Sequence, residues 1–194
     1  MDTQEPRTAD RGRFRFRAAR SSLDLCSTLL WRHGHPVEQL VEPGDLGRWL
    51  AEAGLLDGEV RVDRVQLAAA IRLREAVHRL AGDRIAGRPL DSGALTVLNA
   101  AAAHPVRVPV LAADGTARLG ARYPVAAALA EVARDFVEVV TGSDPGRLRE
   151  CAAADCAFLF VDASRPGTRR WCAADRCANR AYARAHRRRG AGPT

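Results

Sequence analysis

Apolar residues recur at helical spacing through most of the first 141 residues, and this pattern predicts a mainly helical domain. The strongest case is the segment 124–141, where Pro124 suits the first turn of a helix. The apolar stripe of this segment consists of Val125, Leu129, Val132, Phe136 and Val140. Such a stripe is typical of a helix that packs one face against a core.

Four more helices are predicted upstream, at 21–32, 42–54, 63–87 and 91–104. Polar residues that cap helix N-termini begin them: Ser21 or Ser22 at the first, and Asp91 or Ser92 at the last. Gly54 and Pro105 are stop signals for the helices that precede them. The longest segment carries its apolar residues three or four positions apart, at Ala70, Leu73, Val77 and Leu80.

Two segments of the same domain are predicted to be extended or irregular. The runs 106–111 and 116–121 flank Ala113-Asp114-Gly115, which predicts a β-hairpin. Residues 1–20 are polar and rich in arginine, with Phe14 and Phe16 alternating with arginines. This alternation leaves two interpretations open, a short edge strand or a tail.

The composition changes at 143–146, Ser-Asp-Pro-Gly, which divides the chain into a domain at 1–145 and a smaller module at 146–194. All 30 basic residues of the chain are arginine, and its net charge is +7. Residues 147–194 hold 11 arginines and 4 acidic residues, whereas residues 1–146 hold 19 of each. A basic module on a neutral body indicates contact with a polyanion, most often nucleic acid.

Four of the five cysteines lie in this module, as two pairs: Cys151 with Cys156, and Cys172 with Cys177. The sequence shows no signal peptide, so we expect a cytoplasmic protein, in which disulfides are disfavoured. Two close pairs of thiolates suit a structural, tetrahedral Zn²⁺ ion. A redox switch and an iron–sulfur cluster are the alternatives. Cys26 lies in an apolar stretch and is predicted to be a plain buried thiol.

The order of elements in the module predicts a zinc ribbon or a treble-clef-like finger. Cys151 and Cys156 form a first knuckle, followed by a strand at 158–161 and a turn at 164–167. A return strand at 168–172 and a helix at 178–189 complete it. Trp171 is expected to pack against the first strand and shield the metal. The predicted fold class is therefore mainly α with a small β-hairpin, followed by a four-cysteine finger.

At this point the sequence resembles a known family. Cys177-Ala178-Asn179-Arg180 is similar to the motif that gives the CGNR zinc finger its name, with Ala in place of Gly. The segments 160–165 and 169–172 also resemble that finger, and 23–29 and 45–55 resemble the helical ABATE domain that precedes it. The resemblance implies a stress-related transcription regulator whose finger binds DNA. Alanine at position 178 is compatible with a helix, whereas a positive φ there would require glycine.

Eight residues of the finger are candidates for contact with nucleic acid. Arg180, Arg184 and Arg187 share one face of the predicted helix, and their mutual repulsion favours a polyanionic partner. Asn179 and Arg180 have a structural alternative beside the metal, in which Arg180 pairs with Asp162 or Asp175. The full set is Arg169, Arg170, Asn179, Arg180, Arg184, Arg187, Arg188 and Arg189.

Other classes of protein have less support. No apolar run is long enough to span a membrane, and no catalytic motif is present, so we expect no enzymatic activity. His33-Gly34-His35 is interpreted as a loop in preference to a metal site. We expect a DNA-binding transcription regulator whose helical domain senses a signal, such as a small-molecule effector, or forms a homodimer. The alternative is a finger that binds protein or RNA.

Overall fold

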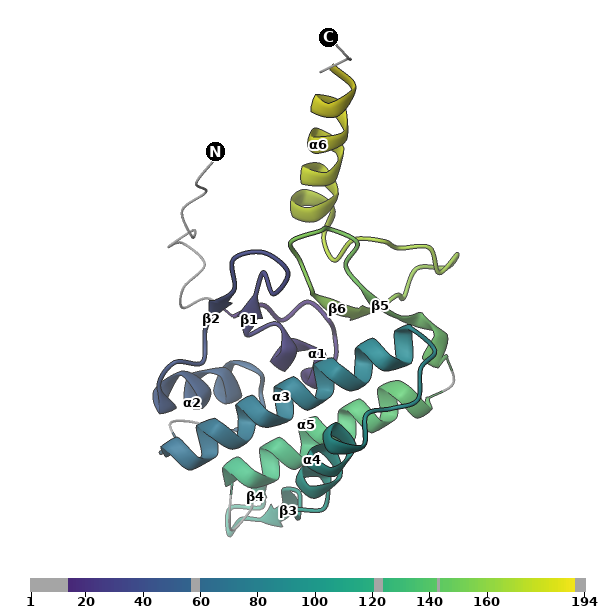
Figure 1. Cartoon of the computed structure of the whole chain (residues 1–194). Coiled ribbons are helices and arrows are strands. Elements are labelled where there is room, and N and C mark those ends of the chain that lie inside the picture. The colour runs from purple at the N-terminus through teal and green to yellow at the C-terminus, as the bar shows by residue number, and fades with distance from the viewer. Residues whose placement is uncertain (1–13, 57–59, 121–123, 143, 191–194) are drawn as a thin grey trace.

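The computed structural model describes residues 14–56, 60–120, 124–142 and 144–190. Figure 1 shows a helical body from which the last helix projects. The body contains α1 (Ser21–Cys26), α2 (Pro43–Glu52), α3 (Arg64–Ile85), α4 (Ser92–Ala102) and α5 (Pro124–Thr141). Within the described residues, no helix is both long enough and apolar enough to cross a membrane.

Helices α3 and α5 pack against each other at the centre of the body, with α1 and α4 against both (Figure 1). The predicted stripe of α5 is confirmed, because Val125, Val132 and Phe136 are almost fully buried. Leu73 and Leu80 of α3 are buried in the same core. The mainly helical domain predicted from periodicity is therefore confirmed.

Polar side chains cap three helices of the body, and the predicted cap of α4 at Asp91 is confirmed. Asp63 and Gln66 form a capping box at the start of α3, and Glu42 and Asp45 form another at the start of α2. The side chain of Asp91 accepts a hydrogen bond from the backbone of α4. These bonds satisfy backbone N–H groups that a helix leaves unpaired at its N-terminus.

Helix α1 is shorter than predicted, since it ends at Cys26 and does not reach residue 32. The hydroxyls of Ser27 and Thr28 donate to the carbonyls of Asp24 and Leu25, which satisfies acceptors at the helix end. The chain then enters β1 (Leu29–Leu30), which pairs antiparallel with β2 (Val37–Glu38). The predicted serine cap of α1 is also wrong, because the N-cap residue is Arg20 and the backbone N–H of Ser22 donates instead to the carboxylate of Asp135 in α5.

The second hairpin is confirmed, with β3 (Val108–Leu111) paired to β4 (Ala117–Gly120). Residues 14–20 form no strand in the described structure, although Phe14 is buried against the body. The carboxylate of Asp24 accepts hydrogen bonds from the backbone of Arg17 and Ala18, which fixes this segment. The remainder of the N-terminal segment, 1–13, lies outside the described residues.

The C-terminal module contains β5 (Leu148–Glu150), β6 (Leu159–Val161), a π-helical turn (Ala174–Ala178) and α6 (Asn179–Gly190). The predicted return strand at 168–172 is wrong, because β6 pairs with β5 instead. The cause is Asp162, whose carboxylate accepts hydrogen bonds from the backbone N–H groups of Ser164 and Arg169. These bonds turn the segment after β6 away from a ladder.

The finger and the body share one apolar core. Leu148, Leu159 and Phe160 are almost fully buried and belong to the same cluster of side chains as the core of α3 and α5. Strand β5 contacts α3, and β6 contacts α1. The base of the finger is therefore built on the helices, whereas α6 extends away from them (Figure 1).

Candidate metal centre

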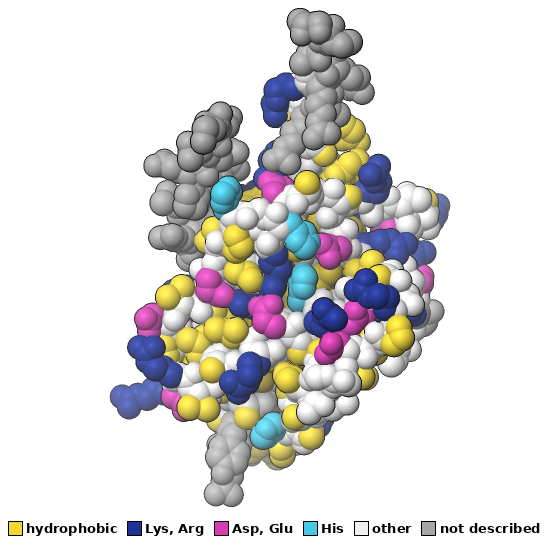
Figure 2. Space-filling model, in the orientation of Figure 1, with side chains coloured by type: hydrophobic (Ala, Val, Ile, Leu, Met, Phe, Trp, Pro, Cys, Tyr) yellow, Lys and Arg dark blue, Asp and Glu magenta, His cyan; other side chains and the backbone are white. Residues whose placement is uncertain are grey.

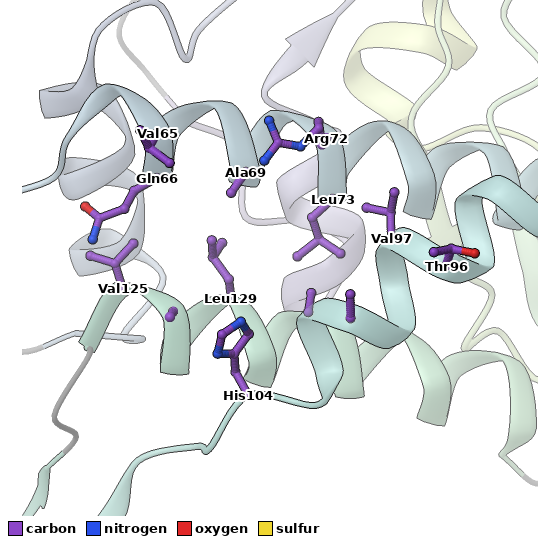
Figure 3. Close-up of a pocket in the computed structure, with 13 residues that line it drawn as sticks. Val65, Gln66, Ala69, Arg72, Leu73, Thr96, Val97, His104, Val125 and Leu129 are labelled. Carbon is purple, nitrogen blue, oxygen red and sulfur yellow. The ribbon is translucent and has the colours of Figure 1, made fainter.

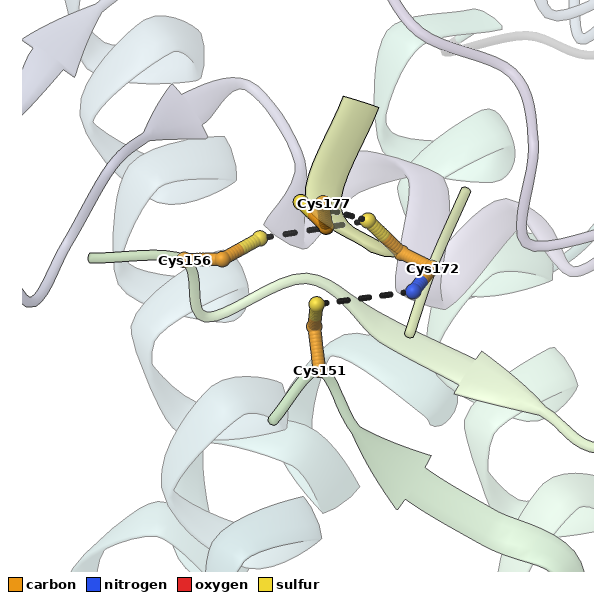
Figure 4. A group of neighbouring side chains, drawn as sticks. All are labelled: Cys151, Cys156, Cys172 and Cys177. Atoms are coloured by element: carbon orange, nitrogen blue, oxygen red, sulfur yellow. Dashed lines mark hydrogen bonds between the residues drawn. The ribbon is translucent and has the colours of Figure 1, made fainter. Parts of the chain in front are cut away.

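Four cysteine side chains converge at the base of α6 (Figure 4). The sulfur atoms of Cys151, Cys156, Cys172 and Cys177 all lie within 4.8 Å of one another. The Cys156–Cys172 sulfur distance is 3.9 Å and the Cys172–Cys177 distance is 3.5 Å. A tetrahedral ion with metal–sulfur bonds of about 2.3 Å requires sulfur atoms about 3.8 Å apart. The four thiols therefore fit a single tetrahedral ion.

Backbone hydrogen bonds hold the ligands in two tight turns. Cys151 donates its N–H to the carbonyl of Phe158 at 3.0 Å, and Cys156 donates to Ala153 at 2.9 Å. These bonds place the first knuckle inside the loop between β5 and β6. Cys177 lies in the π-helical turn and donates its N–H to Ala173 at 3.2 Å.

The site favours a thiolate at Cys151, and hydrogen bonds with Cys151 in turn raise the pKa of the Cys156 and Cys172 thiols. Hydrogen bonds from the thiols of Cys156, Cys172 and Cys177 hold the pKa of the Cys151 thiol far below its usual range. The backbone N–H of Cys172 also donates to the sulfur of Cys151, at 3.4 Å. Thiolate is the form that binds a metal. Because four protein ligands complete a tetrahedral shell, the arrangement is that of a structural centre and leaves no position for substrate.

Arg180 connects the metal centre to the helical body. Its guanidinium donates to both carboxylate oxygens of Asp155 at 3.1 Å and to the sulfur of Cys177 at 3.5 Å. The same group stacks on the ring of Trp31, 4.4 Å from its centroid. Its acidic partner is thus Asp155, and the expected partners Asp162 and Asp175 are wrong. A cation here offsets the charge of the thiolates.

Asp162 organises the loop between the two cysteine pairs. This side chain is fully buried, and it accepts hydrogen bonds from the hydroxyl and N–H of Ser164 and the N–H of Arg169. The Ser164 hydroxyl, which donates the strongest of these bonds, holds the pKa of Asp162 below its usual range. The predicted turn at 164–167 is confirmed, and Gly167 has the positive φ of 63° that glycine accommodates.

Arg169 wraps around the second cysteine pair. Its guanidinium donates to the carbonyls of Trp171 and Cys172 and lies 4.5 Å from the ring of Phe160. Arg169 therefore covers β6 at the position expected for Trp171. The Trp171 ring instead contacts Tyr182 of α6, with centroids 5.5 Å apart.

Three of the remaining candidates lie on the outer surface of the finger. Arg170 is exposed and stacks on Trp171 at 5.0 Å, and Asn179 and Arg187 are exposed on α6. The backbone of Arg184, Arg188 and Arg189 belongs to α6, but their side chains lie outside the described structure. Figure 2 shows basic side chains on this projecting part of the molecule.

The β1–β2 loop of the body touches the first knuckle. A Cβ atom added at Gly34 would lie 3.1 Å from the Cβ of Asp155. The imidazole of His33 is 2.7 Å from the carboxylate of Glu150, so the His33-Gly34-His35 segment is a loop that contacts the finger. Sequence reasoning missed Trp31 and Asp155, because Trp31 lies in the body, far from Arg180 in the sequence, and no spacing pattern links Asp155 with Arg180.

The fold and the four thiols define a class of protein, a helical domain followed by a four-cysteine finger. Comparison with protein families places this chain within that class. Residues 19–143 match ABATE, described as "Putative stress-induced transcription regulator", and residues 147–190 match the CGNR zinc finger. The chain belongs to the ABATE family and carries a CGNR zinc finger, in the order that the motifs predict. A search of curated proteins finds no match.

The alanine in the motif is compatible with the observed backbone. Ala178 is buried at the end of the π-helical turn, and it is absent from the described residues with positive φ. Glycine is therefore not required at this position.

Proposed function

We propose that this protein is a cytoplasmic, non-enzymatic transcription regulator that binds one Zn²⁺ ion and contacts DNA phosphates through its finger. The observation that carries the proposal is the position of the four thiols at the base of a basic helix that projects from the body (Figure 1). The metal centre fixes where this helix begins. The helical body senses a signal or forms a homodimer.

Zinc is the ion that the donor set favours. Four thiolates within 4.8 Å of one another surround a single ion, and Zn²⁺ commonly binds Cys₄ sites in tetrahedral geometry. Four thiolates and one Zn²⁺ carry a net charge of −2, which the guanidinium of Arg180 offsets in part. The bound ion supplies folding energy to the finger.

The DNA-contacting surface consists of the outer face of α6 and the adjoining Arg170. Neither Arg170 nor Arg187 forms an ion pair within the described part of the chain. Both are exposed, so phosphates reach them without breaking an ion pair. Arg180 differs, because Asp155 and Trp31 already occupy its guanidinium. We therefore assign Arg180 to positioning α6 and the outer arginines to phosphate contact.

A salt titration tests this assignment. The affinity of the zinc-loaded protein for a mixed-sequence duplex is measured by fluorescence anisotropy at several salt concentrations. Neutralising several phosphates gives a slope of log K against log salt steeper than about −3. A chain lacking residues 184–194 is expected to lose most of this slope. The variant Arg84→Gln, which removes an exposed arginine from the body, is expected to keep it. No binding at low salt by the folded, zinc-loaded protein would overturn the proposal.

A partly exposed aromatic pair supports a second candidate function, binding of a protein or RNA partner. Tyr182 is 61% exposed although it contacts Trp171, so the finger presents an aromatic surface beside its arginines. Aromatic residues are enriched in protein interfaces and also stack on unpaired bases. A partner whose affinity is insensitive to salt would favour a protein over any nucleic acid.

A further inference from the structure

A cavity of about 410 Å³ opens between α3, α4 and α5 of the helical body (Figure 3). Its size lies within the range of small-molecule sites, about 300–1,000 Å³. The lining side chains are mostly apolar. In Figure 3, Leu73 from α3 and Leu129 from α5 project toward one another across it.

The amino-acid sequence explains why this cavity exists. Four alanines line it, Ala69 on α3, Ala100 and Ala101 on α4, and Ala126 on α5. Short side chains at these positions leave space between helices that are otherwise packed closely. Leu73 and Leu129 belong to the buried core, so an occupant of the cavity would contact the core of the body directly.

The polar groups at the cavity are mainly hydrogen-bond donors. Arg72, Gln66 and His104 line it, and among the described residues no carboxylate does. The Oε1 atom of Gln66 accepts a hydrogen bond from the backbone of Asp63, which leaves its NH₂ group as the available part. The hydroxyl of Thr96 donates to the carbonyl of Ser92 within α4, so only its oxygen faces a ligand as an acceptor.

Arg72 differs from Arg74 and Arg79 on the same helix. Arg74 pairs with Glu38 at 2.6 Å, and Arg79 pairs with Asp83 at 3.5 Å. Arg72 has no ion-pair partner in the described part of the protein, although it stands at the edge of an apolar cavity. A cation in this position complements an anionic group whose apolar body fills the space.

We infer that this cavity binds a small amphipathic carboxylate, with its hydrocarbon part against Leu73 and Leu129 and its acid group on Arg72. As the site of a signal, it rests on the regulatory function proposed above. As a binding site, it can be tested independently of DNA.

The test compares three probes with the same alkyl chain: octanoate, 1-octanol and octylamine. Isothermal titration calorimetry on the full chain is expected to give saturable binding of octanoate at one site. Octanoate is expected to bind about fivefold more tightly than octanol, which is the size of effect of a partly exposed ion pair. Octylamine is expected to bind most weakly.

Two variants distinguish the contribution of the Arg72 charge to binding from that of the apolar cavity. Arg72→Gln is expected to remove the preference for octanoate over octanol, whereas Arg84→Gln, twelve residues along the same helix, is expected to keep it. Ala101→Leu fills part of the cavity and is expected to weaken binding of octanoate and octanol alike. Circular dichroism and the melting temperature verify that each variant is folded.

Three results would overturn the inference: no saturable octanoate binding, an unchanged preference in Arg72→Gln, or unchanged affinity in folded Ala101→Leu. Failure of DNA binding has no bearing on these measurements. Conversely, a protein that binds DNA but not octanoate would lose this inference and keep the proposed function.

Discussion

The helical body and the finger are stabilised by different means. The body buries large apolar side chains such as Trp49, Leu80 and Phe136 in a continuous core. The finger has one short hairpin and relies on four thiols, the Asp162 network and the Arg180–Asp155 pair. Burial of apolar area stabilises the body and the base of the finger, whereas metal ligation together with charge-assisted hydrogen bonds stabilises the cysteine loops and the start of α6. Loss of the metal should therefore affect one part far more than the other.

The largest effect is expected from removing a metal ligand. Cys172→Ser is expected to abolish stoichiometric zinc binding and to unfold α6, because the ion supplies much of the folding energy of a small finger. The measurements are zinc content by mass spectrometry and helix content by circular dichroism. Cys26→Ala is the matched control, since this thiol is buried in the body and its pKa is raised by burial to about 12. That variant should retain one zinc ion per chain.

A core truncation should give the opposite result. Phe136→Ala in α5 is expected to destabilise the body by about 3–5 kcal/mol, the usual cost of removing a buried aromatic side chain. Urea denaturation measures this loss. The variant is expected to keep its zinc under native conditions. Zinc loss equal to that of Cys172→Ser would show that the two parts do not differ in the way described here.

The stability of the helical body should depend on pH through the carboxyl group of Asp24. Burial raises the pKa of this carboxyl from 3.8 to about 6. Between those values the folded state holds the proton more tightly than the unfolded chain, so this group's contribution to stability falls as pH rises from about 4 to 6. Asp24→Asn should remove that slope in urea denaturation across this range. A pH profile identical to that of the wild type would contradict the assignment.

The smallest expected effect is at the junction of the two parts. Arg180→Gln removes the pairing with Asp155 and the stacking on Trp31, and it is expected to weaken zinc binding by about 10- to 100-fold. Competition with a chelator measures this change. Arg170→Gln is the control, because Arg170 stacks on Trp171 at the outer surface. An equal effect of both substitutions would show that Arg180 has no special role in the metal centre.

Local signals in the sequence explain most of the fold. Capping residues and apolar spacing predicted α2 to α5, and the cysteine spacing predicted the metal ligands. The errors arose where side chains bind the backbone. Ser27 and Thr28 end α1 early, and Asp162 prevents the return strand of the finger. Such bonds are hard to predict because the same residue types also occur in helices and strands.

Only part of the metal centre could be predicted from the sequence. The four ligands lie close together in the sequence, at spacings that metal chemistry restricts. The partners of Arg180 follow no such spacing rule, because Trp31 lies in the distant body and Asp155 pairs with Arg180 across the two knuckles. The cavity between α3, α4 and α5 depends on three alanine-containing helices that come together only in the fold.

The proposed role of the metal centre is tested most directly by the DNA affinity of the wild type, Cys172→Ser and Cys26→Ala, measured side by side by fluorescence anisotropy at low salt. The proposed function requires that the metal centre builds the DNA-binding surface. It therefore predicts that the wild type and Cys26→Ala bind equally, whereas Cys172→Ser loses its affinity. Equal DNA binding by Cys172→Ser, with its zinc absent, would contradict it.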